Sequence, residues 1–171
     1  PGPAQILRRT ERPLQIRHDQ TISQPFLVAY MTGQLPLEPH SRVLEVGTGS
    51  GYQAAVLAEI AAEVYTIEIV APLADAARAL LARLGYGRVH TRTGDGYVGW
   101  PEAAPFDAII VTAAAGSVPP PLVQQLRPGG RMVIPVGETG AVQWLILIEK
   151  TADGRTSTRS LLPVRFVPLT G

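Results

Sequence analysis

The segment from Arg42 to Tyr52, RVLEVGTGSGY, joins a short apolar strand directly to a glycine-spaced turn. A helix-forming run, Gln53 to Ile60, follows at once. Glycines at alternate positions let the backbone turn sharply and approach a ligand closely, because no Cβ stands in the way. The first turn of the next helix presents free N–H groups and a partial positive charge, which suit an anionic or polar ligand group. The segment therefore predicts a strand–turn–helix unit with a cofactor turn, the alternative being a tight turn that binds nothing.

The spacing of the glycines narrows the choice of cofactor. Gly47, Gly49 and Gly51 form the pattern G-x-G-x-G, whereas the dinucleotide-binding fingerprint places its third glycine one position later, where this chain has Tyr52. An acidic residue, Glu45, also lies inside the strand, two positions before the first glycine. Together these features favour S-adenosyl-L-methionine over NAD, and an NAD-dependent oxidoreductase is a distant alternative.

Strand-like and helix-like segments alternate along most of the chain. Short apolar runs that alternate with alanine- and leucine-rich helical stretches are typical of a parallel sheet with helices on both faces. The predicted parallel strands are Val43–Val46, Val64–Ile69, Val89–Thr93, Phe106–Thr112 and Arg131–Val136, and the clearest helices are Ala54–Ala61 and Leu73–Leu84. Two further strands, Gln143–Lys150 and Thr156–Val167, are joined by the turn Asp153-Gly154 and predict a C-terminal antiparallel hairpin. The fold class is therefore α/β.

Composition excludes several functional classes. The 171 residues are 46% apolar and 17% charged, which fits one globular domain. A net charge of +1, with scattered basic residues, favours no nucleic-acid partner, and no apolar run is long enough to span a bilayer. The chain has no cysteine, and His18, His40 and His90 lie far apart, so we expect no metal site. Because the chain begins with Pro1-Gly2-Pro3, a fragment, a processed form or a lost targeting segment stays open.

Further candidate residues follow the other predicted strands, at the edge of the sheet where α/β folds bind ligands. Glu68 ends the second strand about twenty residues after the glycines, where an acid can accept hydrogen bonds from both ribose hydroxyls. Asp95, between Gly94 and Gly96, can lie beside an adenine edge. The small residues of Thr112–Gly116 leave room for a substrate. The alternatives are a solvated acid for Glu68, a plain turn for Gly94-Asp95-Gly96 and tight packing for Thr112–Gly116.

A series of short motifs resembles one family. In order along the chain they are Thr21-Ile22-Ser23-Gln24-Pro25, the glycine turn, Gly94-Asp95-Gly96, Ala104-Pro105-Phe106-Asp107-Ala108-Ile109, Leu126-Arg127-Pro128-Gly129-Gly130 and Arg165-Phe166-Val167-Pro168-Leu169. This series is similar to that of the protein-L-isoaspartate O-methyltransferases, which methylate damaged aspartyl and asparaginyl sites. The similarity runs from about Pro13 to Thr170, and it implies a Rossmann-like fold that uses S-adenosyl-L-methionine and releases S-adenosyl-L-homocysteine.

The resemblance implies roles for individual residues. Thr21, Ile22 and Ser23 match the segment that lines the family's reaction centre and part of its cofactor site, with Ser23 in a catalytic position. The other cofactor-binding candidates match further parts of the family's cofactor site. The methionine end is matched by Glu45, Gly47, Thr48, Gly49, Ser50 and Gly51, and the ribose by Glu68. The adenine side is matched by Gly94 and Asp95, and a C-terminal position near the cofactor by Thr170. A helix N-cap ahead of Pro25 is the alternative for Ser23, and the two roles are compatible.

Two departures from the family pattern lie near the start of the chain. Arg17-His18-Asp19-Gln20 replaces a glycine-containing stretch, and the N-terminal segment is short. We therefore expect a truncated N-terminal extension over residues 1–20 and a methyltransferase domain over 21–171. A hydrolytic triad of His18, Asp19 and Ser23 is disfavoured, because sequence neighbours rarely reach that geometry.

The function implied by the resemblance is methylation of the free α-carboxylate of L-isoaspartyl residues, which begins repair through a succinimide. The expected partners are isoaspartyl-containing proteins or peptides, with no nucleic acid and no membrane, and we expect a cytoplasmic monomer. Two alternatives stay open. One is a related carboxyl methyltransferase with another substrate, for example a natural-product peptide, and the other is a non-catalytic S-adenosyl-L-methionine-binding module.

The role of Ser23 is testable by substitution. We expect Ser23→Ala to lower kcat for an isoaspartyl peptide, with cofactor affinity measured alongside, because the hydroxyl is predicted to donate to the acceptor carboxylate and to set its rotation. Steady-state kinetics and calorimetric titration of the cofactor measure the two quantities. Full kcat in the variant, with unchanged cofactor binding, would contradict the assigned role.

Overall fold

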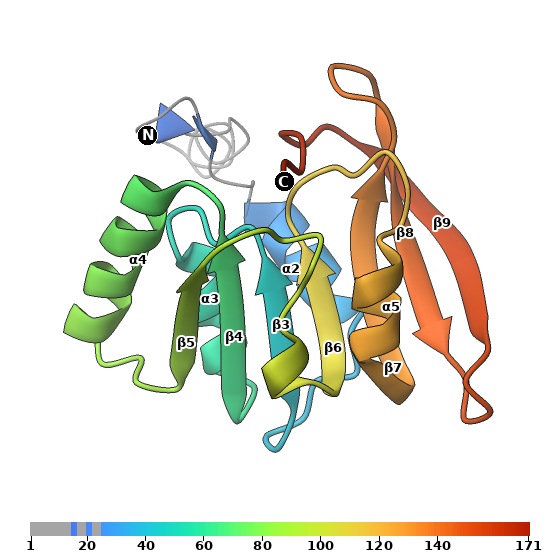
Figure 1. Ribbon diagram of the computed structural model, residues 1–171, viewed down its shortest axis with the longest axis horizontal. Helices are drawn as coiled ribbons and strands as arrows, with labels where there is room; N and C mark the ends of the chain where they lie inside the picture. Colours follow the sequence, from blue (N-terminus) through green and yellow to red (C-terminus); the bar gives the residue numbers. More distant parts are fainter. Residues whose placement is uncertain (1–14, 17–19, 22–24) are drawn as a thin grey trace, which may run out of the picture.

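The computed structural model describes residues 15–16, 20–21 and 25–171 (Figure 1). Seven strands form one sheet in the order β5-β4-β3-β6-β7-β8-β9, and a separate antiparallel pair joins β1 (Gln15–Ile16) to β2 (Gln20–Thr21). The strands of the large sheet are β3 (Arg42–Val46), β4 (Glu63–Glu68), β5 (Val89–Thr93), β6 (Phe106–Val111), β7 (Leu126–Val136), β8 (Gln143–Lys150) and β9 (Thr156–Val164). The helices are α2 (Pro25–Gly33), α3 (Tyr52–Ala58), α4 (Ala71–Arg83), the 3₁₀ turn η1 (Pro101–Ala103) and α5 (Pro120–Gln125).

The sheet has a parallel part and an antiparallel part, as the sequence predicts. Strands β5, β4, β3, β6 and β7 are parallel neighbours, whereas β8 runs antiparallel to β7, and β9 to β8. The hairpin between β8 and β9 turns at Gly154, which has a φ of 82°. The predicted α/β fold with a C-terminal antiparallel hairpin is confirmed.

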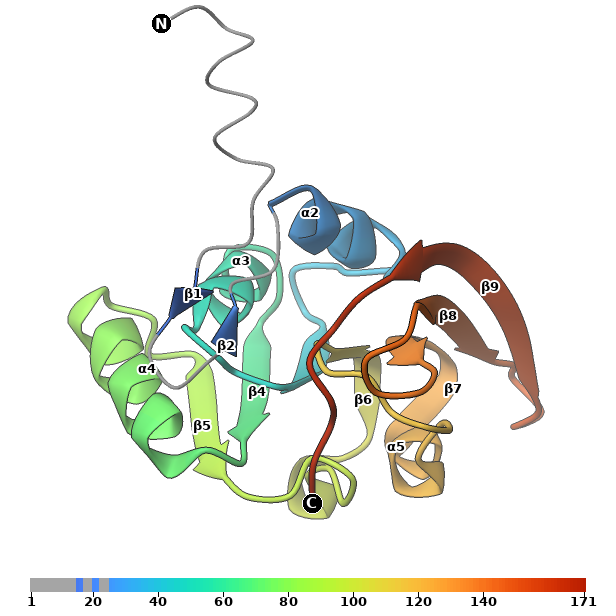
Figure 2. The same cartoon turned by 90° about the horizontal axis from the view of Figure 1, so that it is seen from above.

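Helices cover both faces of the sheet because adjacent strand residues point to opposite sides. Val43 of β3 packs with Leu57 of α3 and Leu81 of α4, whereas its neighbour Leu44 packs on the other face with Leu122 of α5. Seen from above, α2 and α3 lie on one side of the strands and α5 on the other (Figure 2). Two apolar cores therefore hold β3 rigidly at the centre of the sheet.

The observed boundaries differ most from the prediction at β7, which begins at Leu126 and not at Arg131. Leu126 pairs with Phe106, but Arg131 pairs with Ala108, so the extra residues form an irregularity in the ladder. Gly130 lies at this point because a Cβ there would be 2.8 Å from the carbonyl oxygen of Asp107. Helix α5 was not predicted, because its six residues include Pro120 and Pro121 and show no helical period.

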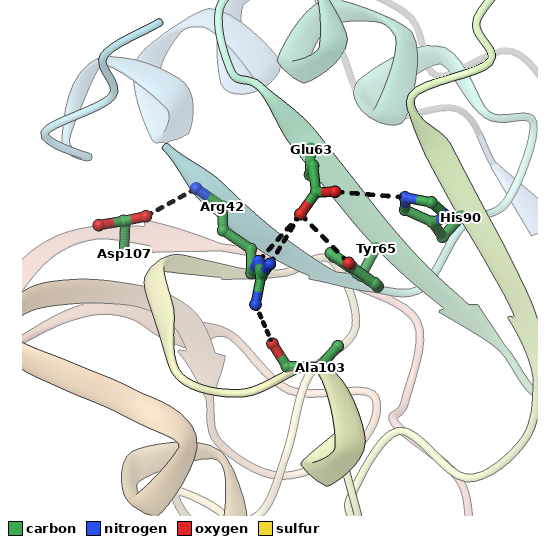
Figure 3. Close-up of polar contacts among 6 residues, drawn as sticks. All are labelled: Arg42, Glu63, Tyr65, His90, Ala103 and Asp107. Atoms are coloured by element: carbon green, nitrogen blue, oxygen red, sulfur yellow. Dashed lines mark hydrogen bonds and ion pairs between the residues drawn. The ribbon is translucent and has the colours of Figure 1, made fainter. Parts of the chain in front are cut away.

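The amino-terminal ends of the strands, away from the cofactor turn, carry a network of polar contacts (Figure 3). The Arg42 guanidinium pairs with Glu63 at 3.0 Å and donates to the carbonyl oxygen of Ala103. Glu63 also accepts a hydrogen bond from the Tyr65 hydroxyl, at 3.2 Å. Both members of the ion pair are about 40% exposed, so its own contribution to stability is small, and the network mainly joins β3, β4 and η1.

Within residues 15–16, 20–21 and 25–171, no helix has the length and apolarity that a membrane crossing requires. The same residues contain no group of three or more His, Asp or Glu side chains placed to hold a metal ion. The division into an extension over 1–20 and a domain over 21–171 stays a prediction.

A buried amide holds the loop that follows β5. Gln125, at the end of α5, is 7% exposed. Its Oε1 accepts from the Trp100 backbone N–H at 2.7 Å, and its Nε2 donates to the Val98 carbonyl oxygen at 2.8 Å. Gly99 comes so close to this amide that a Cβ there would be 2.5 Å from Oε1. The amide therefore fixes the loop that begins with Gly94-Asp95-Gly96.

We expect Gln125→Met to lower the free energy of unfolding by about 1–3 kcal/mol, because two hydrogen bonds, each worth about 0.5–1.5 kcal/mol net, are lost. Gln124→Met is the matched control, since the neighbouring Gln124 side chain is exposed. Urea denaturation of the two variants checks the difference. Equal stabilities would show that the Gln125 amide does not hold the loop.

Candidate functional site

A cleft of about 850 Å³, open to solvent, lies at the carboxyl ends of the parallel strands. The glycine turn and the ends of β3 and β4 form one side, and residues after β6 and near the C-terminus form the other. Its lining residues are Val28, Glu45, Val46, Gly47, Thr48, Gly49, Ser50, Tyr52, Gln53, Ile67, Glu68, Ile69, Val70, Gly96, Thr112, Ala113, Val167, Pro168, Leu169 and Thr170.

The glycine turn is clamped between its two neighbouring strands. The N–H groups of Gly47 and Thr48 both donate to the carbonyl oxygen of Ile67, at 2.8 and 3.2 Å. On the other side the Thr112 hydroxyl donates to the Gly47 carbonyl oxygen at 2.7 Å. Gly47 has a φ of 97°, and a Cβ on it would be 2.5 Å from the Thr112 Oγ1. Only glycine meets both conditions at this position.

Glu68 holds the turn from the end of β4. Its Oε2 accepts from the Gly49 backbone N–H at 2.9 Å, and its Oε1 accepts from the Val70 backbone N–H at 3.0 Å. The side chain is 8% exposed and lines the cleft. Because each carboxylate oxygen has a second acceptor position, the group can still receive two donors from a ligand.

A chain of buried hydroxyls leads from the turn to Glu45. The Thr66 hydroxyl donates to Glu45 Oε2 at 2.6 Å and lies 2.6 Å from the Thr48 hydroxyl. Since Thr66 has one proton and gives it to Glu45, Thr48 must be the donor in the second contact. Complete burial raises the pKa of the Glu45 carboxyl to about 8, the Thr66 hydrogen bond lowers it, and the nearby Glu68 raises it further.

Two buried oxygens on residues that line this cleft have no hydrogen-bond partner in the part of the chain that the structure describes. They are Oε1 of Glu45 and Oε1 of Gln53. Gln53 lies in the first turn of α3, and its Nε2 donates to the Thr32 hydroxyl of α2 at 3.0 Å. An unsatisfied buried acceptor costs about 1–3 kcal/mol, so the pair fits a ligand group that carries several N–H donors. The ammonium group of S-adenosyl-L-methionine meets this requirement.

The C-terminal segment forms the far wall of the cleft. The Ala114 N–H donates to the Val167 carbonyl oxygen, and the Leu169 N–H donates to that of Ala114, both at 2.8 Å. The Tyr97 hydroxyl donates to the Leu169 carbonyl oxygen at 3.3 Å. These bonds bring residues that are more than fifty positions apart to one edge of the cleft, next to the loop after β5.

The structure brings seven of the predicted site residues together in the cleft: Glu45, Gly47, Thr48, Gly49, Ser50, Glu68 and Thr170. Three others, Gly51, Gly94 and Asp95, are not among the residues that line it. Gly51 packs against α4, since a Cβ there would be 3.4 Å from Leu81. The Asp95 carboxylate accepts from the Tyr97 N–H at 2.8 Å and lies against Gly171.

The remaining predicted residues precede α2. Thr21 ends β2, whereas Ile22 and Ser23 lie outside the described residues. The capping alternative for Ser23 requires a helix directly after it, and α2 does begin at Pro25. Gln53 is not among the predicted site residues, although a polar residue on the buried side of a predicted helix, just after the glycine turn, is a usable signal.

Comparisons with known proteins agree on one family. The family model for protein-L-isoaspartate(D-aspartate) O-methyltransferase matches residues 6–171. The chain belongs to this family. A Nitrosospira multiformis protein named protein-L-isoaspartate O-methyltransferase 1 is 61% identical over 97% of the chain and 70% of its own length. A Polaromonas protein named protein-L-isoaspartate O-methyltransferase 2 is also 61% identical, over 99% of the chain and 81% of its own length.

Solved structures of protein-L-isoaspartate O-methyltransferases have the same fold. One has a TM-score of 0.85 at 32% identity, covering 92% of this chain, and the chain spans about half (51%) of its length. A Plasmodium falciparum protein with this name, solved with S-adenosyl-L-homocysteine, has a TM-score of 0.78 at 29% identity and covers 92% of this chain and 79% of its own. The predicted family, enzyme class and S-adenosyl-L-methionine cofactor are therefore confirmed.

Burial of Glu45 makes the stability of the free protein depend on pH. The pKa of Glu45 is about 8 in the folded protein, against an ordinary value of 4.5, so the unfolded chain loses this proton first as pH rises. Between these values wild type loses about 1.4 kcal/mol of stability per pH unit through this group. We expect Glu45→Gln, which cannot ionise, to gain on the order of 3 kcal/mol over wild type between pH 5 and pH 8.

Urea denaturation without ligand at pH 5, 6.5 and 8 measures this gap. Glu138→Gln is the matched control, because the Glu138 side chain is exposed on the loop between β7 and β8. A gap between wild type and Glu45→Gln that stays constant with pH would mean that Glu45 ionises normally in the folded protein.

Proposed function

We infer that this protein transfers the methyl group of S-adenosyl-L-methionine to the free α-carboxylate of L-isoaspartyl residues in damaged proteins or peptides. The observation that carries this inference is the conjunction of the family match over residues 6–171 with a cleft that has a clamped glycine turn and two carboxyl groups. Bound S-adenosyl-L-methionine supplies an electrophilic methyl group on a positively charged sulfur. The methyl ester of the product then closes without the enzyme to a succinimide, which reopens partly to normal aspartate.

We propose that three parts of the chain hold the cofactor. The methionine end lies over Gly47–Ser50 and beside Glu45, where the structure has a backbone turn and a buried acceptor. Glu68 receives the ribose hydroxyls, because its oxygens keep free acceptor positions beside their two backbone donors. The adenine lies on the side of Gly94-Asp95-Gly96 and Thr170, where Gly96 and Thr170 line the cleft.

We further propose that the segment before α2 holds the acceptor. Thr21, Ile22 and Ser23 immediately precede this helix, and Val28 of the same helix lines the cleft. An isoaspartyl α-carboxylate is already a nucleophile, so no strong base is required of the protein. Its task is to align one carboxylate oxygen with the methyl carbon, in line with the departing sulfur. Positioning of this kind can lower the activation barrier by several kcal/mol, up to about 7–11.

Charge in the cleft favours this division of tasks. No Lys or Arg is among its lining residues, whereas Glu45 and Glu68 are both on the cofactor side. The Glu68 carboxylate therefore attracts the cationic cofactor, and the anionic acceptor is attracted only after the cofactor is in place. We propose isoaspartyl-containing proteins as the partners and a monomer as the working unit, since large exposed apolar side chains such as Phe26, Leu84 and Trp144 come from separate elements.

The deciding experiment is methyl transfer from labelled S-adenosyl-L-methionine to an isoaspartyl peptide. We expect base-labile methyl ester on this peptide and none on the peptide of the same sequence with normal aspartate, because only the isoaspartyl form presents a free α-carboxylate on the side branch. Transfer to neither peptide, with intact cofactor binding, would refute the proposed substrate and favour a carboxyl methyltransferase with another acceptor or a non-catalytic binding module.

A matched pair of variants links any transfer to this cleft. Glu68→Gln should lower kcat/KM for the cofactor at least tenfold, because the amide places an N–H group against a backbone N–H donor. Glu63→Gln should not, since Glu63 lies at the opposite end of β4 in the network of Figure 3. Equal activity of the two variants would exclude Glu68 from the cofactor site.

A further inference from the structure

The two ends of the Gln53 amide have different surroundings. Its Nε2 donates to the Thr32 hydroxyl of α2, but its Oε1 has no partner among the residues that the structure describes. The side chain is 6% exposed and lines the cleft. Buried amide oxygens in folded proteins almost always accept a hydrogen bond, so this atom requires a donor that the described protein atoms do not supply.

Glu45 likewise has a carboxyl oxygen that receives no hydrogen bond from the described residues. The Thr66 hydroxyl occupies its Oε2, while Oε1 is buried, unpartnered within the described residues and carried by a side chain of the same cleft. The two oxygens come from neighbouring elements, β3 and α3, on either side of the glycine turn. A single group with several N–H donors is the simplest ligand for both, and an ammonium group has three.

Among the described residues, none of those around Glu45 carries a positive charge that could stabilise its ionised form. Strand β4 contributes Thr66 and Glu68, strand β6 contributes Ile110 opposite Glu45, and Gln53 of α3 lines the same cleft. Glu68 is the charged member of this described set, and it has the same sign. Without ligand, the Glu45 carboxyl therefore keeps its proton, as its raised pKa also indicates.

We propose that Gln53 is a positioning residue that binds the ammonium group of S-adenosyl-L-methionine together with Glu45, and that Glu45 gives up its proton to solvent when this group binds. The inference rests on the proposed function. To cofactor binding it adds a second acceptor, Gln53, and the release of one proton. Because the other end of the Gln53 amide is bonded to α2, the same contact ties the cofactor to the helix that follows the acceptor segment.

Calorimetric titration of the wild-type protein with S-adenosyl-L-homocysteine tests the proposal without a variant. Measured at pH 7.0 in phosphate and in Tris, which have different ionisation enthalpies, binding should release about one proton. The affinity should rise close to tenfold per pH unit from pH 6 to 7.5, because the proton must leave a carboxyl whose pKa is about 8. A deamino analogue of the ligand should release no proton and bind at least tenfold more weakly.

Two variants separate the roles of the residues. Glu45→Gln should bind without proton release, and Gln53→Met should reduce the preference for the amino ligand over its deamino analogue at least fivefold. Gln124→Met, on an exposed side chain of α5, should behave as wild type. A purely structural role of Gln53 would weaken both ligands equally and leave this preference unchanged, which would overturn the proposal.

The outcomes also distinguish this inference from the proposed function. Binding of S-adenosyl-L-homocysteine without proton release, or with equal affinity for the deamino analogue, would refute the inference alone. No binding of S-adenosyl-L-homocysteine would refute the proposed function and the inference together.

Discussion

The clamp on the glycine turn is the constraint on which the rest of the site depends. The turn is bonded on one side to β4, through Ile67 and Glu68, and on the other side to Thr112 after β6. Both neighbours belong to a sheet whose two faces are packed in apolar cores. The backbone donors of the turn therefore keep their places before any ligand arrives. Such preorganisation is what a binding site needs, because little ordering cost is left for the binding step.

The two carboxyl groups of the cleft have different tasks because their surroundings differ. Glu68 accepts two backbone N–H groups and thereby serves both the fold and the site. Glu45 is completely buried, receives one hydroxyl and has a pKa of about 8. A buried acid with an unpartnered oxygen is costly in the free protein, and this cost is recovered only with a cationic donor. In the proposed role of Glu45, some stability of the free protein is exchanged for discrimination between ligands.

Much of this arrangement could be predicted from the sequence, because its determinants are local. The glycine spacing, the apolar runs and the Asp153-Gly154 turn each act within a few residues, and the strands they predict lie within a few residues of the observed ones. The early start of β7 could not be predicted, since it depends on a pairing between Leu126 and Phe106 that only the folded sheet brings about. The same holds for Gln53, whose significance arises from Thr32 on another helix.

By itself the sequence determined the parallel α/β fold, the cofactor turn, the strand-end acid Glu68 and the family, because these are written in residue types at short spacings. Only the tertiary structure decided that Gly51 packs against α4, that the Asp95 carboxylate bonds to the loop backbone, and that residues 167–170 close the cleft. It also decided that Glu45 and Gln53 line one cleft and that each has a buried oxygen without a partner among the described residues. Burial and hydrogen-bond satisfaction are properties of the whole packed molecule, and no short segment specifies them.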